Sequence, residues 1–508
     1  MGNTAVALNR VSRIVGYQLT TGNFAATSPN LPQRLAMFGE ANHANQSSLV
    51  LTPTQITSAQ QAGALFGYGS PMHIMSRILF PVTGNGGLNG LPLWAYPQAE
   101  APSASSKKIE ITASGVATAN GTHYLVIAGR EGLEGQFYAI NILAGDTAAI
   151  IATKMANAVN NILGSPMTGV ATPYVCDFES KWKGLTADAL SITIDTNSTV
   201  NALGITYIIA SIQSGSGTPD VGPATLLFGS AWNTIALNPY GDNTTVMTTL
   251  EAFNGVPDPA NPTGRFAGTV MKPFIALTGS TDNDPSAITD ARLGNLTIAI
   301  CPAPGSAGLP MEASANMAVL FANVSQNTPH LDVAGKTYPD MPTPASIGSM
   351  ADYNNRDIIV QKGCSTVTLH AGVYKVEDFV TTWHPQGETP PQFRYCRNLM
   401  IDMNIRFMYH ILEETNVENH TIANDSDTVT ASSVVKPKIW RQVLQGFASD
   451  LGKAALIADV PFMQNSITVA IGVTNPDRLE TFFKYKRTGF VRIASTQAQA
   501  GFNFGTTN

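Results

Sequence analysis

The residues with the greatest capacity for chemistry in this sequence are its four cysteines. They are widely separated along the chain, at Cys176, Cys301, Cys364 and Cys396. Zinc sites and the disulfide frameworks of small secreted proteins require cysteines at short, regular spacings. The spacing predicts neither kind of site. Unpaired thiols of this kind are typical of a protein in a reducing cytosol.

Histidines and paired aspartates are the other candidate metal ligands. The eight histidines are scattered as single residues. The pairs Asp282/Asp284 and Asp425/Asp427 lack the glycine and the terminal glutamate of a calcium-binding loop. We therefore expect these aspartates in solvated turns or helix caps, and we assign no catalytic, cofactor-binding or metal-binding residue.

Glycine-rich stretches could hold a phosphate group, but none of them has the required spacing. The stretch HLDVAGKT has His330 where a P-loop requires glycine, and GNGGLNG has Asn89 where a dinucleotide motif requires its third glycine. The sequence also has no G-x-S-x-G nucleophile elbow and no HExxH motif. Local motifs therefore favour a protein that is not an enzyme. An α/β hydrolase-like enzyme, with a site assembled only by folding, stays open as an alternative.

The composition predicts an unusually uncharged surface. Charged residues make up 13% of the 508 residues, against roughly 25% in typical soluble domains. The net charge of −6 argues against nucleic-acid binding through a basic surface. No stretch approaches the roughly 18 consecutive apolar residues of a membrane span, and the N-terminus lacks the apolar core of a secretory signal. Low charge suits either a neutral monomer or a subunit packed against copies of itself.

The two ends of the chain are basic, in contrast to the acidic remainder. Residues 1–34 contain three arginines and no acid, and residues 484–508 contain four basic residues and no acid. Basic ends on an acidic body favour electrostatically complementary self-association. A chance excess of charge in short tails is the alternative.

Hydrophobic periodicity predicts the elements of the first hundred residues. Residues 11–20 alternate in the manner of a strand, but a Gly/Thr/Ser/Pro-rich run separates this strand from the body. A lone strand must pair with a sheet edge, either in its own domain or in another subunit. A helix after Ser58 is expected to bury Ala62, Leu65 and Phe66.

Later segments predict further elements. Residues 107–219 are expected to form a self-contained module, in which a helix begins after the N-cap Asp146 and buries Ile150 and Met155 on one face. The α/β pattern then resumes. In the C-terminal third we expect a helix that begins with Pro437 and a strand at 490–493.

The overall prediction is an α/β and α+β multidomain protein, with an interrupted α/β sandwich domain, an inserted α+β domain, an α+β C-terminal domain and extended terminal arms. The expected ranges are 1–31 for the N-terminal arm, 32–100 and 220–345 for the α/β domain, 101–219 for the inserted domain, 346–490 for the C-terminal domain and 491–508 for the C-terminal arm.

Three motifs resemble the contractile tail sheath proteins of Mu-like bacteriophages. Residues 56–79 carry a helix ending in Leu-Phe-Gly-x-Gly-Ser, followed by a second helix with spaced methionines. Residues 129–160 are similar to the strand, "GDT" turn and Ala-rich helix of that family, and NPDRLETFFKYKRTGF at 475–490 matches the pattern before its last segment. The three motifs occur in the family's order and span most of the chain.

The resemblance implies a structural protein that polymerises as stacked hexameric rings around a tail tube and contracts to drive the tube through a host envelope. Implied partners are other copies of the chain, the tube protein, and the baseplate and tail-terminator proteins. No cofactor, nucleic acid or membrane insertion is implied. The implied location is a virion tail assembled in the host bacterial cytoplasm. The sheath of a contractile bacteriocin or secretion device, and a capsid or surface-layer protein, are the related alternatives.

The resemblance also implies that terminal arms add strands to sheets of neighbouring subunits. The candidates for strand addition are Val11, Val15, Tyr17, Leu19, Ile493, Phe502 and Phe504. The candidates for an electrostatic contact with the tube or another subunit are Lys484, Lys486, Arg487 and Arg492. A solvated helix face is the alternative for the first three of these basic residues.

Overall fold

The computed structural model describes residues 29–82, 86–197, 203–258, 260–344, 346–388 and 392–500. The strand predicted at 11–20 lies outside these residues, together with its candidates Val11, Val15, Tyr17 and Leu19. Phe502 and Phe504 lie outside them as well. No helix within the described ranges is long and apolar enough to span a membrane.

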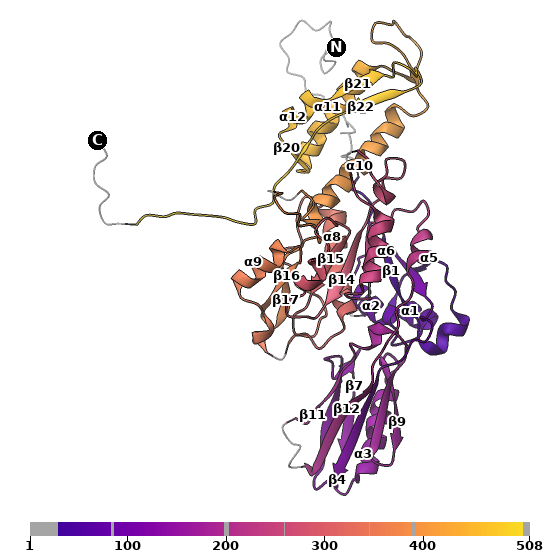
Figure 1. The fold of residues 1–508 in the computed structure, drawn as a ribbon, viewed down its shortest axis with the longest axis vertical. Helices are drawn as coiled ribbons and strands as arrows, with labels where there is room; N and C mark the ends of the chain where they lie inside the picture. The colour runs from indigo at the N-terminus through magenta and orange to yellow at the C-terminus, as the bar shows by residue number, and fades with distance from the viewer. Residues whose placement is uncertain are drawn as a thin grey trace, which may run out of the picture.

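A six-stranded sheet forms the centre of the molecule (Figure 1). Its strands are β1 (Leu35–Glu40), β2 (Thr54–Ile56), β3 (Leu93–Gln98), β13 (Ile235–Asn238), β14 (Ile275–Ser280) and β15 (Ile298–Pro302). The order is β15-β14-β13-β1-β3-β2, and all neighbours are parallel except β2 and β3. Chain segments from before residue 100 and after residue 230 therefore share one sheet. The predicted domain ranges remain predictions.

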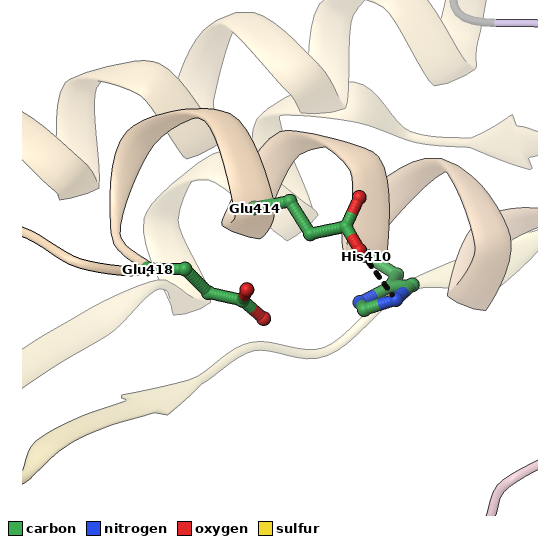
Figure 2. Close-up of side chains that lie close together, drawn as sticks. All are labelled: His410, Glu414 and Glu418. Atoms are coloured by element: carbon green, nitrogen blue, oxygen red, sulfur yellow. Dashed lines mark ion pairs between the residues drawn. The ribbon is translucent and has the colours of Figure 1, made fainter.

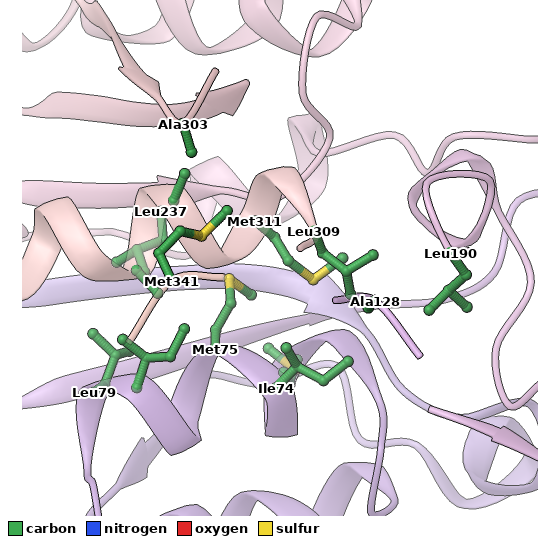
Figure 3. Close-up of a cluster of buried hydrophobic side chains, with 14 of the residues drawn as sticks. Ile74, Met75, Leu79, Ala128, Leu190, Leu237, Ala303, Leu309, Met311 and Met341 are labelled. Atoms are coloured by element: carbon green, nitrogen blue, oxygen red, sulfur yellow. The ribbon is translucent and has the colours of Figure 1, made fainter. Parts of the chain in front are cut away.

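Helices cover both faces of this sheet. Both faces are therefore buried, and the strands carry apolar side chains on both sides. The helices of this part are α1 (Ala59–Phe66), α2 (Pro71–Leu79), α5 (Gly222–Leu226), α6 (Thr244–Asn254), α7 (Ser286–Thr289) and α8 (Pro310–Asn327). Leu35 and Met37 of β1 pack into the core under α2 and α8, and Ala36 and Phe38 pack into the core under α6. In the first of these cores, side chains of α2 lie beside those at the start of α8 (Figure 3).

One prediction for α1 is wrong. Ser58 caps the helix by accepting a hydrogen bond from the Gln61 backbone N–H, and Ala62 and Phe66 are buried as expected. Leu65, however, is 44% exposed. In a helix this short, the buried stripe includes positions four residues apart, and Leu65 lies beside that stripe on the solvent side.

A second group of sheets is formed between β3 and β13 in the chain, and it lies at one end of the molecule (Figure 1). One sheet has the order β12-β4-β10-β9 and another has the order β11-β5-β8. The elements are β4 (Lys108–Gly115), β5 (Gly121–Ile127), β6 (Gly132–Leu133), β7 (Gln136–Phe137), β8 (Ala139–Ile142), α3 (Ala148–Asn160), β9 (Met167–Thr172), β10 (Val175–Ser180), β11 (Ile192–Asp195) and β12 (Ile205–Gln213).

The start of α3 differs from the prediction. Thr147, not Asp146, is the N-cap residue. Asp146 instead accepts hydrogen bonds from the Leu143 backbone N–H at 2.7 Å and from Lys154 Nζ at 2.5 Å. Ile150 is 43% exposed, whereas Met155 is fully buried, as predicted. The hairpin of β9 and β10 was missed by the sequence analysis, because polar residues interrupt its apolar alternation.

The C-terminal third has its own core, centred on two long helices. Its elements are α9 (Tyr353–Gln361), β16 (Thr366–His370), β17 (Val373–Asp378), α10 (Cys396–Asn416), β18 (Thr421–Ile422), β19 (Val434–Val435), α11 (Pro437–Lys453), β20 (Ile457–Ala458), α12 (Val460–Ser466), β21 (Thr468–Ile471), β22 (Leu479–Phe482) and β23 (Lys486–Arg487). Short 3-10 helices lie at His43–Ser48, Leu185–Ala187, Gly264–Phe266 and Ile347–Ser349.

The strand predicted at 490–493 is not formed within this chain. Residues 488–500 belong to no helix or strand, and the described chain after residue 492 extends away from the body (Figure 1). A strand requires a partner strand for its backbone hydrogen bonds, and this segment has none among the described residues. All four cysteines are free and buried.

Candidate assembly surface at the ends of the chain

Arg487 fixes the chain to α10 shortly before the C-terminal segment leaves the body. Its guanidinium forms a two-point ion pair with Asp402, with Nε 2.7 Å from Oδ1 and Nη2 2.5 Å from Oδ2. Tyr485 donates a hydrogen bond from its hydroxyl to the same Oδ1 at 2.9 Å. Two-point pairing between arginine and carboxylate fixes geometry as well as charge. The end of β22 and all of β23 are thereby attached to the long helix.

Arg492 forms a second attachment point five residues later. Its guanidinium pairs with Asp332 and, at 2.8 Å, with Asp378, and it lies 3.8 Å from the ring centre of Tyr395. The Asp332 side chain is only 2% exposed. Burial raises the pKa of Asp378, and the positive charge of Arg492 opposes that rise. Removing Arg492 would therefore leave two carboxyl groups without their cation.

Arg397 of α10 holds the segment between these two attachment points. It donates from Nη1 to the Thr488 carbonyl and from Nη2 to Thr488 Oγ1, both at 2.9 Å. Its Nε donates to the His330 carbonyl at 2.7 Å. Three arginines thus fix residues 487–492, and we call this cluster of Arg397, Arg487 and Arg492 with their carboxylates the arm root.

Beyond the arm root the described chain is exposed. Residues 493–500 are all exposed, and the side chain of Ile493 is 87% exposed. Val491, one residue before Arg492, is 81% exposed. An uncharged, extended segment with open backbone groups is suited to pairing with another sheet edge. Ile493 is the strand-addition candidate that the structure describes.

The two lysine candidates differ from the arginines in their surroundings. Lys486 Nζ lies 2.6 Å from Asp459 and 4.3 Å from the ring centre of Phe462, but both members of the ion pair are about half exposed. Lys484 Nζ lies 5.8 Å from the ring centre of Phe482, and Lys484 forms no ion pair with another described residue. Of the four basic candidates, Arg487 and Arg492 are therefore committed to contacts within the chain, and Lys484 is the most available for a partner.

The first described residues are attached to the same long helix. The Leu31 backbone N–H donates to Asn404 Oδ1 at 2.8 Å, and Leu31 is buried. The Asn30 side chain donates to the Gln326 carbonyl of α8 at 2.9 Å. Since Asn404 lies two residues after Asp402, one segment of α10 holds the chain near both of its ends. The sequence analysis did not predict this role, because neither residue belongs to a recognisable motif.

An exposed cluster of possible metal ligands lies at the C-terminal end of α10 (Figure 2). His410 Nε2 forms an ion pair with Glu414 at 3.1 Å, and Glu418 completes a group whose ligand atoms lie within 4.8 Å of one another. The His410 and Glu414 side chains are about half exposed. Such surface groups occur commonly without a metal, and we assign no function to them.

The carboxyl end of the six-stranded sheet is where α/β enzymes bind their ligands. A cavity of about 370 Å³ lies there, and its lining includes Tyr240, Ser280 and Asp282. Among the described residues, no histidine, cysteine or lysine lines it. The lining does hold serine and aspartate, which can act as nucleophile and as base, but among the described residues no histidine lies beside them to activate the serine.

Comparisons with known proteins cover nearly the whole chain. No family model matches the sequence. The Mu-like prophage FluMu tail sheath protein of Haemophilus influenzae is 24% identical over 489 residues, covering 94% of this chain and 95% of that protein.

Two solved structures were also matched. The sheath tail protein of Desulfitobacterium hafniense is 11% identical, with 94% of this chain and 100% of that one covered and a TM-score of 0.44. The helical sheath of the anti-feeding prophage in its contracted state is 12% identical, with 97% and 100% covered and a TM-score of 0.46. The conclusion rests on the sequence match. Over nearly its whole length this chain resembles the tail sheath proteins of Mu-like bacteriophages, which confirms the resemblance inferred from its three motifs.

Proposed function

We propose that this chain is the structural subunit of a contractile phage tail sheath, which polymerises around a tail tube and contracts to drive the tube through the host envelope. The observation that carries the proposal is the match to a tail sheath protein along 94% of the chain. A match of this length leaves only about 6% of the chain uncovered. It favours a structural role over the hydrolase-like alternative.

The subunits are linked by the terminal arms in this proposal. The C-terminal arm follows the arm root, so its starting point is fixed while residues 493–500 stay exposed. Backbone hydrogen bonds to a neighbouring sheet would supply affinity, and alternate side chains such as Ile493 would set the register. The N-terminal candidates Val11, Val15, Tyr17 and Leu19, and the C-terminal candidates Phe502 and Phe504, are proposed to act in the same way.

The antiparallel pair of β21 and β22 is a suitable acceptor for such strands. It is a sheet of only two strands, and such a pair is marginally stable without further strands or packing. Trp440 of α11 donates a hydrogen bond to Thr481 of β22 at 3.1 Å, which fixes one face of the pair on the helices. Added strands on its edges would enlarge the sheet without moving this core.

The attachment of both chain ends to α10 suits a mechanical role. Tension on either arm would reach Asp402 or Asn404, which lie within one turn of the same 21-residue helix. A continuous helix transmits force with little deformation, because its backbone bonds are aligned along the axis. Rings could then move relative to one another while the connections between subunits persist.

The remaining assignments follow from the same proposal. The ranges 32–100 with 220–345, 101–219 and 346–490 are proposed as domains, and the middle range is proposed to face outward. Lys484 is the strongest candidate for an electrostatic contact with the tube or a neighbour, since it forms no ion pair with another described residue and only a distant contact with the Phe482 ring. The baseplate, the tail terminator and assembly in the host cytoplasm belong to the proposal as well.

Negative-stain electron microscopy of the purified chain, with and without the tube protein, tests the proposal. Striated hollow tubes are the expected result, and small separate particles with tube protein present would contradict it. A variant that lacks residues 493–508 is expected to remain folded and monomeric. A deletion of residues 1–24 is expected to have the same effect. Tubes formed by either truncated variant would rule out the arm as a necessary link.

A further inference from the structure

Glu40 is an unusual residue at the end of the central strand β1. It is fully buried, and its Oε1 has no hydrogen-bond partner among the described residues. The other oxygen, Oε2, receives a long hydrogen bond of 3.4 Å from the Thr186 hydroxyl. A buried carboxyl group usually pairs with a cation or several donors. Among the described residues Glu40 has no cation beside it, and its donors are the distant Thr186 hydroxyl and its own backbone N–H.

The Glu40 carboxyl group faces a loop from the second group of sheets. This loop, residues 181–188, packs across the carboxyl end of β1. Trp182 is fully buried and donates from Nε1 to Thr186 Oγ1 at 2.9 Å, so Thr186 connects the indole to Glu40. Gly184 has φ +129°, and a side chain there would approach Glu40 Oε1 to 2.9 Å. The loop thus fits closely around the carboxyl group and leaves no room for bulk water.

The same loop joins the two parts of the molecule. The His43 backbone N–H, just after β1, donates to the Lys181 carbonyl at 2.8 Å. Gly184 donates to the Ser105 carbonyl and Leu185 donates to the Gly217 carbonyl. Residues 105 and 217 lie on the two chain segments that connect the six-stranded sheet to the second group of sheets. The loop is therefore one of the contacts between the six-stranded sheet and the second group of sheets, beside their shared hydrophobic core and the ion pair of Arg130 with Glu312.

The charged and titratable groups that face Glu40 do not neutralise it. Burial is the main cause that raises the pKa of Glu40 to about 8; contacts with its own backbone N–H and with the Thr186 hydroxyl oppose the rise, and the negative charge of Glu100 adds to it. Tyr240 follows β13 and is also buried, with a hydroxyl that has no partner among the described residues. Glu40 is therefore uncharged at neutral pH.

We propose that the uncharged Glu40 carboxyl group latches the loop at 181–188 onto the end of the six-stranded sheet, and that ionisation of this group opens the latch. An isolated carboxylate in such a site has no cation and little solvent, so its charge is stabilised only when the loop moves and admits water. Opening would loosen this one contact between the two parts of the molecule while their shared hydrophobic core stays packed. This inference does not depend on the proposed sheath function.

A second group in the loop titrates in the same range and must be separated from Glu40. Burial lowers the pKa of Lys181 to about 8, and its ammonium donates to the Leu163 carbonyl at 2.9 Å and to the Tyr68 carbonyl at 3.4 Å. Loss of its proton would weaken these bonds. Any pH effect that persists without Glu40 would belong to this lysine.

Hydrogen exchange of the full-length protein, read by mass spectrometry, tests the latch. Opening of the peptide that covers 180–188 is measured from about pH 6 to about pH 10, after correction for intrinsic exchange. The wild type is expected to show an opening constant at least about tenfold greater at the high end. Glu40→Gln is expected to change less than about twofold over the same range. Glu251→Gln is the control, since Glu251 is a buried carboxylate that is paired with Arg292 at 2.5 Å.

An equal rise in the wild type and in Glu40→Gln would overturn the proposal and assign the effect to Lys181 or to another group. A wild type with no rise would overturn it without any variant. If Glu40→Gln does not fold, Thr186→Val supplies a second test, because it removes the hydroxyl that contacts Glu40. It is expected to increase opening several-fold already at neutral pH, and an unchanged opening constant would count against the latch.

Discussion

Two regions of this molecule bury carboxyl groups, and they treat them in opposite ways. At the arm root, Asp332, Asp378 and Asp402 each receive an arginine within hydrogen-bond distance. At the end of β1, Glu40 is more deeply buried and receives only a weak hydroxyl contact. The comparison teaches that burial alone does not decide the state of an acid. A cation beside a buried carboxyl group stabilises its charged form and fixes the geometry of the pair. Without a cation the buried carboxyl group is neutral, and the contact that it makes is sensitive to pH.

Removing the cation of the arm root should give the largest effect. Arg492→Met leaves Asp332 and Asp378 buried without their partner, and breaking a buried pair in this way costs about 3 kcal/mol. Urea unfolding of the full chain should show this loss in the free energy of unfolding. Arg441→Met, at an exposed position of α11, is the matched control and should change the value by less than about 0.5 kcal/mol. Equal effects of the two variants would erase the distinction between the regions.

Removing the unpaired carboxyl group of Glu40 should raise the free energy of unfolding instead of lowering it. The pKa of Glu40 in the folded chain, about 8, exceeds its ordinary value, so wild-type stability falls as the pH rises from about 4.5 to about 8. Glu40→Gln lacks this loss and should be more stable by about 5 kcal/mol at pH 9, with little difference at pH 4. Unfolding curves at the two pH values measure it. A variant that is less stable than the wild type at pH 9 would contradict the description of Glu40 as an unpaired group.

Changing the geometry of the arm root without changing its charge should have a smaller effect. Arg487→Lys keeps a cation beside Asp402 but cannot form the two-point contact, and about 1 kcal/mol of stability should be lost. Hydrogen exchange in residues 485–488 should rise in parallel. If lysine supports the same exchange rates as arginine, only the charge of this residue matters.

The exposed pair near the arm root should have the smallest effect. Lys486 and Asp459 are both about half exposed, and surface pairs of this kind contribute between 0 and about 1 kcal/mol. Lys486→Met should therefore change the free energy of unfolding by less than about 0.5 kcal/mol. A loss comparable to that of Arg492→Met would show that exposure does not separate the two classes of ion pair here.

Local sequence patterns predicted the elements well where an apolar stripe and a cap coincide. The helix after Ser58 begins where its capping residue requires, and the helix that begins with Pro437 is α11. The errors lie at positions beside a stripe, such as Leu65 and Ile150, because periodicity identifies the buried face but not its width. The N-cap of α3 was misplaced by one residue, since Asp146 bonds Lys154 instead.

The residues of the candidate site, like the helices and strands, were only partly predictable from the sequence. The sequence identified Arg487 and Arg492 as basic residues near an uncharged end, which composition alone can reveal. It could not identify Asp402, Asn404 or Asp332 as their surroundings, because these residues are distant in the chain and belong to no motif. Contacts between residues more than 80 positions apart depend on how the helices pack.

By itself, the sequence determined the helix and strand preferences, the low surface charge, the basic ends and the resemblance to tail sheath proteins, because each of these is a local pattern or a sum over residues. Only the tertiary structure decided that α10 holds both chain ends, that the arm root is neutralised within the chain, and that Glu40 has no cation. The free energy of a charge depends on which groups and how much water surround it, and folding alone sets those surroundings.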